Sequence, residues 1–212
     1  SFFRNPSADL FLSQDQITAD IFDDCAALHF CSVDLVDWPV RLAHRKAIGL
    51  AGRAGAILSF DPNVRLPLWS SPEECQKAIR EFLPYADLVK LSDDEVEFVT
   101  GCTDEREAAE KLFAMGCRLL LVTRGADGSA AYTPHAEAFA ETLRVPVTDT
   151  TGAGDSFIGS FLYQLTRDGV TREGLAALDS KQLADYLAFS ARYASLTVQH
   201  KGAVMATLDE LE

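Results

Sequence analysis

The stretch Arg118-Leu119-Leu120-Leu121-Val122-Thr123 is almost wholly apolar and has the length of a single strand. Such a run predicts a strand that is buried on both faces, as in a parallel sheet. Gly125 and Gly128 follow it and predict a turn into a second strand over residues 129–133. This part of the chain therefore predicts an α/β protein built on a buried central sheet.

The chain on either side of this stretch alternates between strand-like and helix-like segments. Further strands are expected over residues 28–33, 56–60, 87–91 and 138–147. Helices are expected over residues 39–53, 71–83, 93–100, 104–115, from 152 onward, and 181–197. Strands separated by helices form βαβ units with right-handed crossovers and a parallel sheet. We therefore expect residues 1–212 to form one α/β domain.

Composition and charge exclude several classes of protein. The chain has 212 residues, 48% of them apolar, and a formal net charge of −13. This apolar content excludes a disordered chain, and no apolar run approaches the roughly 20 residues of a membrane helix. Negative charge repels nucleic acid and anionic lipid, so we expect neither as a partner. Five scattered cysteines and the lack of a visible secretion signal predict reduced thiols in the cytoplasm.

The motif Asp149-Thr150-Thr151-Gly152-Ala153-Gly154-Asp155 lies between an expected strand and an amphipathic helix. Residues 152–154 would open that helix, where free amides and the positive end of the helix dipole bind anions. Asp155 could accept a proton from an attacking hydroxyl while the amides stabilise a transferring phosphoryl group. Alternatively, Asp155 only complements the helix dipole and the glycines only turn the chain.

Three weaker features follow other expected strands. Thr123, Gly125 and Gly128 could border a nucleotide, although glycines in such a turn usually only supply positive φ. Glu95 could help to hold a hydrated magnesium ion, or it could belong to a solvated acidic first turn of a helix. Arg65 could clamp phosphate or sugar oxygens, or it could be an exposed solubilising side chain.

The chain resembles the ribokinase-like (PfkB) sugar kinases, and within them the fructokinases. The resemblance rests on five segments in the expected order, FFRNPSADLFL (2–12), DPNVRLPLW (61–69), ADLVKLSDDEVEFVTG (86–101), LLLVTRGADG (119–128) and DTTGAGDSF (149–157). The DTxGAGD pattern is specific for the family, and DPNxRLPLW points to its fructokinase branch. The resemblance implies a ribokinase-like three-layer α/β/α fold with a mostly parallel sheet. It also implies transfer of the ATP γ-phosphate to fructose, giving fructose 6-phosphate.

The resemblance further implies roles for the matching residues. Asp155 would be the base, and Gly152, Ala153 and Gly154 would form the anion hole. The nucleotide would contact Thr123, Arg124, Gly125, Gly128, Lys90 and Ser190, the last within Phe189-Ser190-Ala191 where fructokinases tend to have Phe-Ala-Asn. The sugar would contact Arg65 and Arg4. Glu95 would organise Mg²⁺, with Ser92 at the asparagine position of the family's NxxE motif. A potassium-like cation would lie near Asp149, Thr151 and Gly202.

The same resemblance implies that the N-terminal strands, most of the lid and part of the sugar site are absent from this chain. Residues 1–12 would then be a remnant of a lid strand, with Phe2, Phe3 and Phe11 short of packing partners. In the full-length protein, the lid could join two copies into a homodimer.

Other functions stay open at this point. Related kinases act on 2-keto-3-deoxygluconate, ribose or an aminoimidazole riboside, and the chain could also be a nucleotide-binding fragment without turnover. A dinucleotide-dependent dehydrogenase is disfavoured, because residues 152–155 lie late in the chain. In addition, no acidic residue about 20 positions further on ends a strand to hold the ribose.

Overall fold

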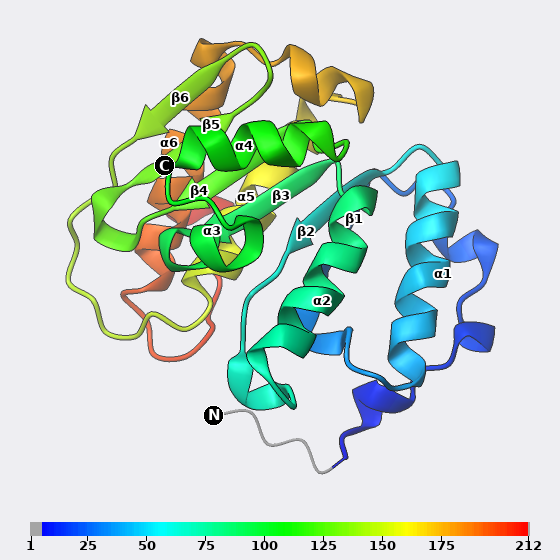
Figure 1. The fold of residues 1–212 in the computed structure, drawn as a ribbon. Coiled ribbons are helices and arrows are strands. Elements are labelled where there is room, and N and C mark those ends of the chain that lie inside the picture. The colour runs from blue at the N-terminus through cyan, green and yellow to red at the C-terminus, as the bar shows by residue number, and fades with distance from the viewer. Residues whose placement is uncertain (1–5, 212) are drawn as a thin grey trace.

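The computed structural model describes residues 6–211, which form a six-stranded sheet with helices on both faces (Figure 1). The strands lie side by side in chain order: β1 (Ala27–Cys31), β2 (Ile57–Asp61), β3 (Leu88–Ser92), β4 (Leu119–Thr123), β5 (Ser129–Tyr132) and β6 (Glu137–Ala140). The first four strands are parallel, whereas β5 and β6 are antiparallel to their neighbours. The expected mostly parallel sheet is therefore confirmed.

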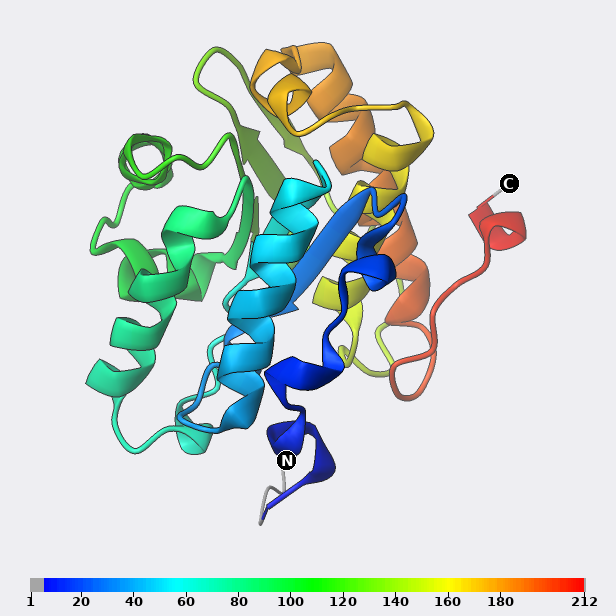
Figure 2. The ribbon, with the colours of Figure 1, turned by 90° about the vertical axis from the view of Figure 1, so that its right-hand side faces the viewer.

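The helices divide into two layers. They are α1 (Pro39–Arg53), α2 (Pro72–Phe82), α3 (Asp93–Thr100), α4 (Glu105–Ala114), α5 (Ala153–Arg167) and α6 (Ser180–Thr197). The first four pack on one face of the sheet, and α5 and α6 pack on the other (Figures 1 and 2). The three-layer α/β/α architecture is thus as expected.

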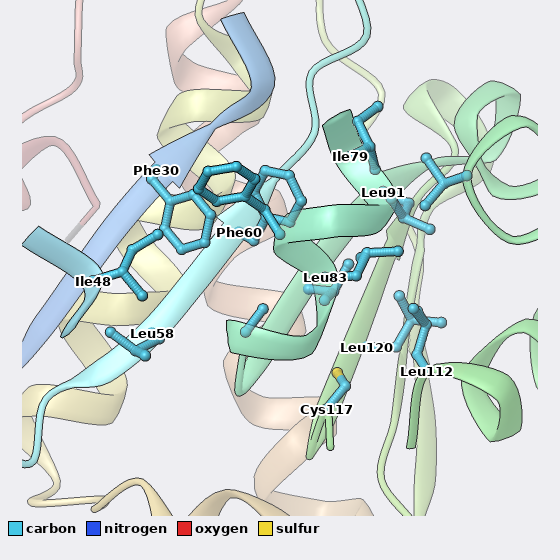
Figure 3. Packing of buried hydrophobic residues seen from close by; sticks show 14 of the residues in the cluster. Phe30, Ile48, Leu58, Phe60, Ile79, Leu83, Leu91, Leu112, Cys117 and Leu120 are labelled. Carbon is cyan, nitrogen blue, oxygen red and sulfur yellow. The ribbon is translucent and has the colours of Figure 1, made fainter. Parts of the chain in front are cut away.

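Strand β4 shows why the sequence is apolar at every position of its central run. Leu120 and Val122 belong to the core beneath α1–α4, whereas Leu119 and Leu121 belong to the core beneath α5 and α6. All four side chains are fully buried. Figure 3 shows the first of these cores, in which Leu120 lies near Leu112 and the rings of neighbouring strands stack.

Capping residues set the ends of the helices. The Ser71 hydroxyl accepts a hydrogen bond from the amide of Glu74 at 3.3 Å and starts α2. The Asp104 carboxylate accepts one from the amide of Glu107 at 2.9 Å and starts α4. Gly101 ends α3 in the left-handed conformation, with φ of 77°. These local signals explain why the expected helices match the observed ones within one or two residues.

The strand expected over residues 138–147 is wrong beyond Ala140. Ala140 pairs with Ser129, the first residue of β5, and the chain before Ser129 turns back toward β4 at Gly128. Residues after Ala140 consequently have no strand to pair with, although their apolar positions alternate. Leu143 and Val147 are accordingly exposed, at 50% and 63%.

The lid strand expected over residues 1–12 is wrong for its described part. Residues Ala8–Phe11 form a short 3₁₀ helix, because no strand of the described chain lies beside them to complete a ladder. Phe11 is 54% exposed and makes an edge contact with Trp38, so its expected shortage of packing partners holds. Phe2 and Phe3 lie outside the described residues.

All five thiols are free, and burial raises the pKa of Cys117 to about 12, which keeps that thiol protonated. Among residues 6–211, no helix combines the length and the apolar character needed to cross a bilayer.

Candidate functional site

The candidate site lies where the carboxyl ends of the parallel strands meet the start of α5. Parallel strands end at the same edge of a sheet, which is where α/β proteins bind ligands. Asp61 ends β2, Ser92 ends β3 and Thr123 ends β4. The first turn of α5 lies against these ends, because a Cβ built on Gly154 would be 3.3 Å from the Nζ atom of Lys90 on β3.

The first turn of α5 has the geometry expected of an anion site. Gly152 is its N-cap and adopts a left-handed conformation, with φ of 83°, while its carbonyl accepts the amide of Ser156 at 2.8 Å. The Ala153 amide donates to the Thr150 carbonyl at 3.2 Å. The amides that follow have no partner within the helix and point out of its end. Asp155 is exposed in this turn. The structure thus brings residues 152–155 together at a helix N-terminus, as the sequence predicts.

Gly152 is required at its position for two reasons. Left-handed φ is costly for any residue with a side chain. A Cβ would also lie 3.1 Å from the Cβ and 3.2 Å from the Cα of Ala203, in the segment that follows α6. The turn is therefore packed closely against the C-terminal part of the chain.

A buried ion pair between Lys90 and Asp61 lies beneath this turn. The sequence singled out Lys90 but not Asp61. Lys90 Nζ is 3.0 Å from the Oδ2 atom of Asp61, and the two residues are 6% and 3% exposed. Burial raises the pKa of Asp61, while the positive charge of Lys90 opposes that shift. A lysine within the apolar strand β3 and an aspartate ending the apolar strand β2 are the sequence signals for this pair.

His29 and Ser59 form a second polar contact in the same region. They are register partners on β1 and β2, and the Nδ1 atom of His29 lies 2.9 Å from the Ser59 hydroxyl. His29 is exposed at its surface, and partial desolvation by the surrounding protein lowers its pKa, a shift that the negative charge of Asp155 opposes. The sequence contained no spacing signal for His29, since the contact is between strands.

Glu95 is buried and does not belong to a solvated acidic turn. Its side chain accepts the amides of Ser92 at 2.9 Å and of Val64 at 2.6 Å, and the residue is 8% exposed. Its negative charge adds to the effect of burial in raising the pKa of Asp61. No group of three or more His, Cys, Asp or Glu residues in the described chain converges on a metal position. A single carboxylate such as Glu95 is compatible with Mg²⁺, which keeps several of its waters and takes only one or two carboxylates.

Asp149 joins the motif to the segment after α6. Its Oδ1 atom accepts the Thr151 amide at 2.9 Å and the Thr151 hydroxyl at 2.7 Å, and its Oδ2 atom accepts the Gly202 amide at 2.9 Å. These hydrogen bonds, the Thr151 hydroxyl first, lower the pKa of Asp149 to about 2. The three residues implied for a monovalent cation are therefore adjacent in the structure.

Replacing Asp149 with Asn should release the Gly202 amide, because the remaining oxygen can still accept the bonds from Thr151. An amide side chain offers one acceptor oxygen, so we expect the Gly202 amide to exchange with solvent about tenfold faster. Because the pKa of Asp149 is depressed, its hydrogen bonds persist above about pH 4 and are lost as the pH falls toward 2. Hydrogen exchange followed by NMR between pH 7 and 2 checks this. Equal exchange in the two proteins would contradict it.

The loop after β4 contains the other expected nucleotide contacts, and Arg124 is already engaged there. Its guanidinium makes a bidentate ion pair with Glu105, at 2.7 and 2.6 Å, and lies over the ring of Phe139. The Tyr132 hydroxyl donates to the same carboxylate at 2.7 Å. The side chain of Arg124 therefore packs toward α4 and β5 and not toward the α5 turn. Thr123 and Gly125 lie at the strand end, as expected.

A groove of about 680 Å³ is partly lined by the ion pair between Arg124 and Glu105. It is lined by residues 103–106 together with Arg124, Tyr132 and Phe139, among others. No residue of the α5 turn lines it, so the groove has no direct part in chemistry at Asp155.

Gly128 cannot be replaced without moving the backbone. Its φ of 97° and ψ of −155° suit glycine alone, and a Cβ would lie 2.4 Å from the Ala140 carbonyl oxygen. We expect Gly128→Ala to lower the free energy of unfolding by about 2–4 kcal/mol, measured by urea denaturation. Gly125→Ala is the matched control, because a Cβ there meets no described atom within 4 Å. Equal losses in the two variants would contradict this explanation.

Three further residues were expected to bind ligands. Two of them lie apart from the α5 turn, and the third is not among the residues that the structure describes. Ser190 is fully buried between α5 and α6, where its hydroxyl accepts from Gln164 at 3.3 Å. The Ser190 side chain is thus covered in this structure, and its expected contact with a nucleotide stays a prediction. Arg65 is exposed, and its guanidinium donates to the Val64 carbonyl. Arg4 lies outside the described residues.

Comparisons with family models, sequences and solved structures all point to the same protein family. The model of the pfkB family carbohydrate kinases matches residues 1–210. "Probable fructokinase-2" of Arabidopsis thaliana is 41% identical over 212 residues, covering 100% of this chain and 63% of the relative. "Fructokinase-2" of Solanum lycopersicum is 40% identical over 97% of this chain and 61% of its own length. The chain thus spans less than two thirds of these relatives.

Solved structures agree with this result. The fructokinase of Xylella fastidiosa with bound ATP superimposes with a TM-score of 0.85 and 31% identity, covering 96% of this chain and 64% of that one. A fructokinase double mutant from Vibrio cholerae, bound to fructose, ADP and potassium, gives a TM-score of 0.81 and 32% identity over 96% of this chain and 63% of that one. The fold is therefore ribokinase-like, and the chain belongs to the pfkB family of carbohydrate kinases.

Proposed function

We propose that the protein carrying this chain transfers the γ-phosphoryl group of ATP to a sugar hydroxyl, with fructose as the sugar. The observation that carries the proposal is the exposed Asp155 in the first turn of α5, next to Gly154, which lies close to the buried ammonium of Lys90. Relatives named fructokinases, at about 40% identity, support the choice of sugar. The known fructokinase structures with ATP, or with fructose and ADP, support the two substrates.

In the proposed reaction the amides of residues 152–154 hold the γ-phosphoryl group at the positive end of α5. Asp155 accepts the proton of the sugar hydroxyl as its oxygen forms a bond to phosphorus. The bond between phosphorus and the β,γ-bridging oxygen breaks, and ADP leaves with that electron pair. Thr123, Gly125 and Gly128 border the nucleotide, and Arg65 and Arg4 are assigned to the sugar.

We also propose how the ions would be held. Glu95 would bind Mg²⁺ through its waters, and the ion would neutralise phosphate charge. The loop formed by Asp149, Thr151 and Gly202 would flank a potassium-like cation. Residues 1–212 would act as a single kinase domain, and a homodimer through the lid is proposed for the longer protein.

A panel of sugars tests this function. We expect ADP production with ATP and fructose to exceed that with ribose, 2-keto-3-deoxygluconate and aminoimidazole riboside. The panel should be run on residues 1–212 and on the protein with the sequence that flanks them in nature. Turnover by the longer form alone would mean that the sugar site needs the flanking sequence. ATP binding without ADP production in both forms would favour a nucleotide-binding protein.

A further inference from the structure

The loop that follows β4 is not fixed by its own backbone. Gly125 and Gly128 have positive φ values of 53° and 97°, and glycine loses the most conformational freedom when one conformation is selected. Arg124 has φ of −120° and ψ of 31°, which lies outside both the strand and the helix regions. Residues 125–127 are also exposed, so core packing does not hold them. Contacts from neighbouring elements are therefore needed to keep this loop in one conformation.

The Arg124 side chain provides such a contact, and it depends on Glu105. The two side chains are 24% and 19% exposed and form the bidentate pair at 2.7 and 2.6 Å. The Tyr132 hydroxyl donates to the same carboxylate at 2.7 Å, and the Phe139 ring lies beneath the guanidinium. Burial alone would raise the pKa of Glu105, but the hydrogen bonds from Arg124 and Tyr132 lower it below its usual value. The carboxylate therefore stays charged at neutral pH and keeps Arg124 in place.

Glu105 is itself carried by a fixed element. It is the first residue of α4, directly after the N-cap Asp104. The buried face of α4 consists of Ala108, Ala109 and Leu112, which belong to the core on that side of the sheet. A continuous series of contacts thus runs from this core through Glu105 and Arg124 to the loop.

We propose that Glu105 is a positioning residue that, through the Arg124 guanidinium, holds the Thr123–Gly128 loop in the conformation that receives the nucleotide. This inference rests on the proposed function and deepens it, because it names a determinant of ATP affinity outside the groups that touch ATP. Helices α4 and α5 lie on opposite faces of the sheet, so Glu105 acts through the loop and not on the phosphates at α5. It takes no part in proton transfer at Asp155.

The test measures kcat and the KM values for ATP and fructose on the protein with its natural flanking sequence. We expect Glu105→Gln to raise the KM for ATP about 5–20-fold, because a charged bidentate pair is lost and the loop is less pre-organised. The kcat and the KM for fructose should change less than twofold. Arg124→Met should have an effect of similar size, and the double variant should be no worse than either single one. Calorimetric binding of a non-hydrolysable ATP analogue checks that KM reports affinity.

Glu137→Gln is the matched control. It removes one carboxylate from the same groove, where the Glu137 side chain is 65% exposed and lies 3.7 Å from Arg106. The KM for ATP should not change in this variant, because an exposed pair of this kind contributes little. Urea denaturation of every variant separates a purely structural role. Such a role lowers the free energy of unfolding and the amount of active protein, but it does not move the KM for ATP.

The outcomes separate the inference from the function on which it rests. A KM for ATP and an analogue affinity within twofold of the wild type in Glu105→Gln would overturn the inference, even if that variant is less stable. If Arg124→Met is far more impaired and the two effects add, the guanidinium contacts the nucleotide itself and the positioning role of Glu105 is overturned. In both cases phosphorylation of fructose by the wild-type protein leaves the proposed function standing. A wild-type protein that binds no nucleotide overturns both.

Discussion

Asp155→Ala is expected to lower kcat by about 10³–10⁴-fold, with the affinity for ATP changed less than threefold. The carboxylate is exposed in the first turn of α5, so it can face an incoming hydroxyl without being needed for folding. Its loss removes the proton acceptor and leaves the amides that would hold the phosphates. Steady-state kinetics with fructose and ATP, together with calorimetric ATP binding, measure both quantities.

Two further variants make the Asp155 experiment decisive. Asp155→Asn keeps the shape of the side chain but cannot accept the proton, so it should be as impaired as the alanine variant. Asp185→Ala removes an exposed carboxylate of α6 and should retain full activity. Turnover by Asp155→Ala within tenfold of the wild type would refute the assignment of the base, and equal loss in Asp185→Ala would point to a general effect of charge.

Gly152→Ala should have the second largest effect, through the shape of the turn. This position has a left-handed φ, which strains any residue with a side chain. The new Cβ would also contact Ala203 at 3.1–3.2 Å, so the turn must move. We expect kcat to fall about 100-fold, because displacing catalytic groups by about 1 Å costs this much. The free energy of unfolding should fall by only about 1–2 kcal/mol, since one residue is strained. Kinetics and urea denaturation on the same preparation separate the two effects.

The double variant Gly152→Ala, Ala203→Gly is the matched control. Removing the Ala203 methyl relieves the 3.1 Å contact but leaves the 3.2 Å contact with its Cα and the backbone strain. Activity should therefore return in part. If Gly152→Ala alone keeps wild-type kcat, the backbone of residues 152–154 does not hold the transferring group, and the proposed mechanism loses its anion site.

The regular elements could be predicted because their signals are local. Residues 119–122 are apolar at every position and are buried on both faces of the sheet. Helices α1–α4 begin and end within one or two residues of where capping and glycine patterns place them. Residues 141–147 carry strand-like alternation without forming a strand. The difference is that a strand needs a partner, and Gly128 has already turned the neighbouring chain away.

The candidate site was predictable in part for the same reason. Residues 152–155 are contiguous, so their sequence specifies a helix N-terminus with a carboxylate in its first turn. Arg124 and Ser190 match a family pattern at single positions, but their surroundings come from other elements. Glu105 engages Arg124, and Gln164 covers Ser190 inside the α5–α6 layer. A single-residue match does not specify such neighbours.

The sequence by itself determined the α/β class, the family and the turn at the start of α5, because each depends on residues close together in the chain. Only the tertiary structure placed Lys90 against Asp61 and beneath Gly154, since these come from β3, β2 and α5. Whether a buried lysine meets a carboxylate depends on which strands are neighbours in the sheet. That adjacency is decided by packing of the whole sheet, and no local stretch of sequence contains it.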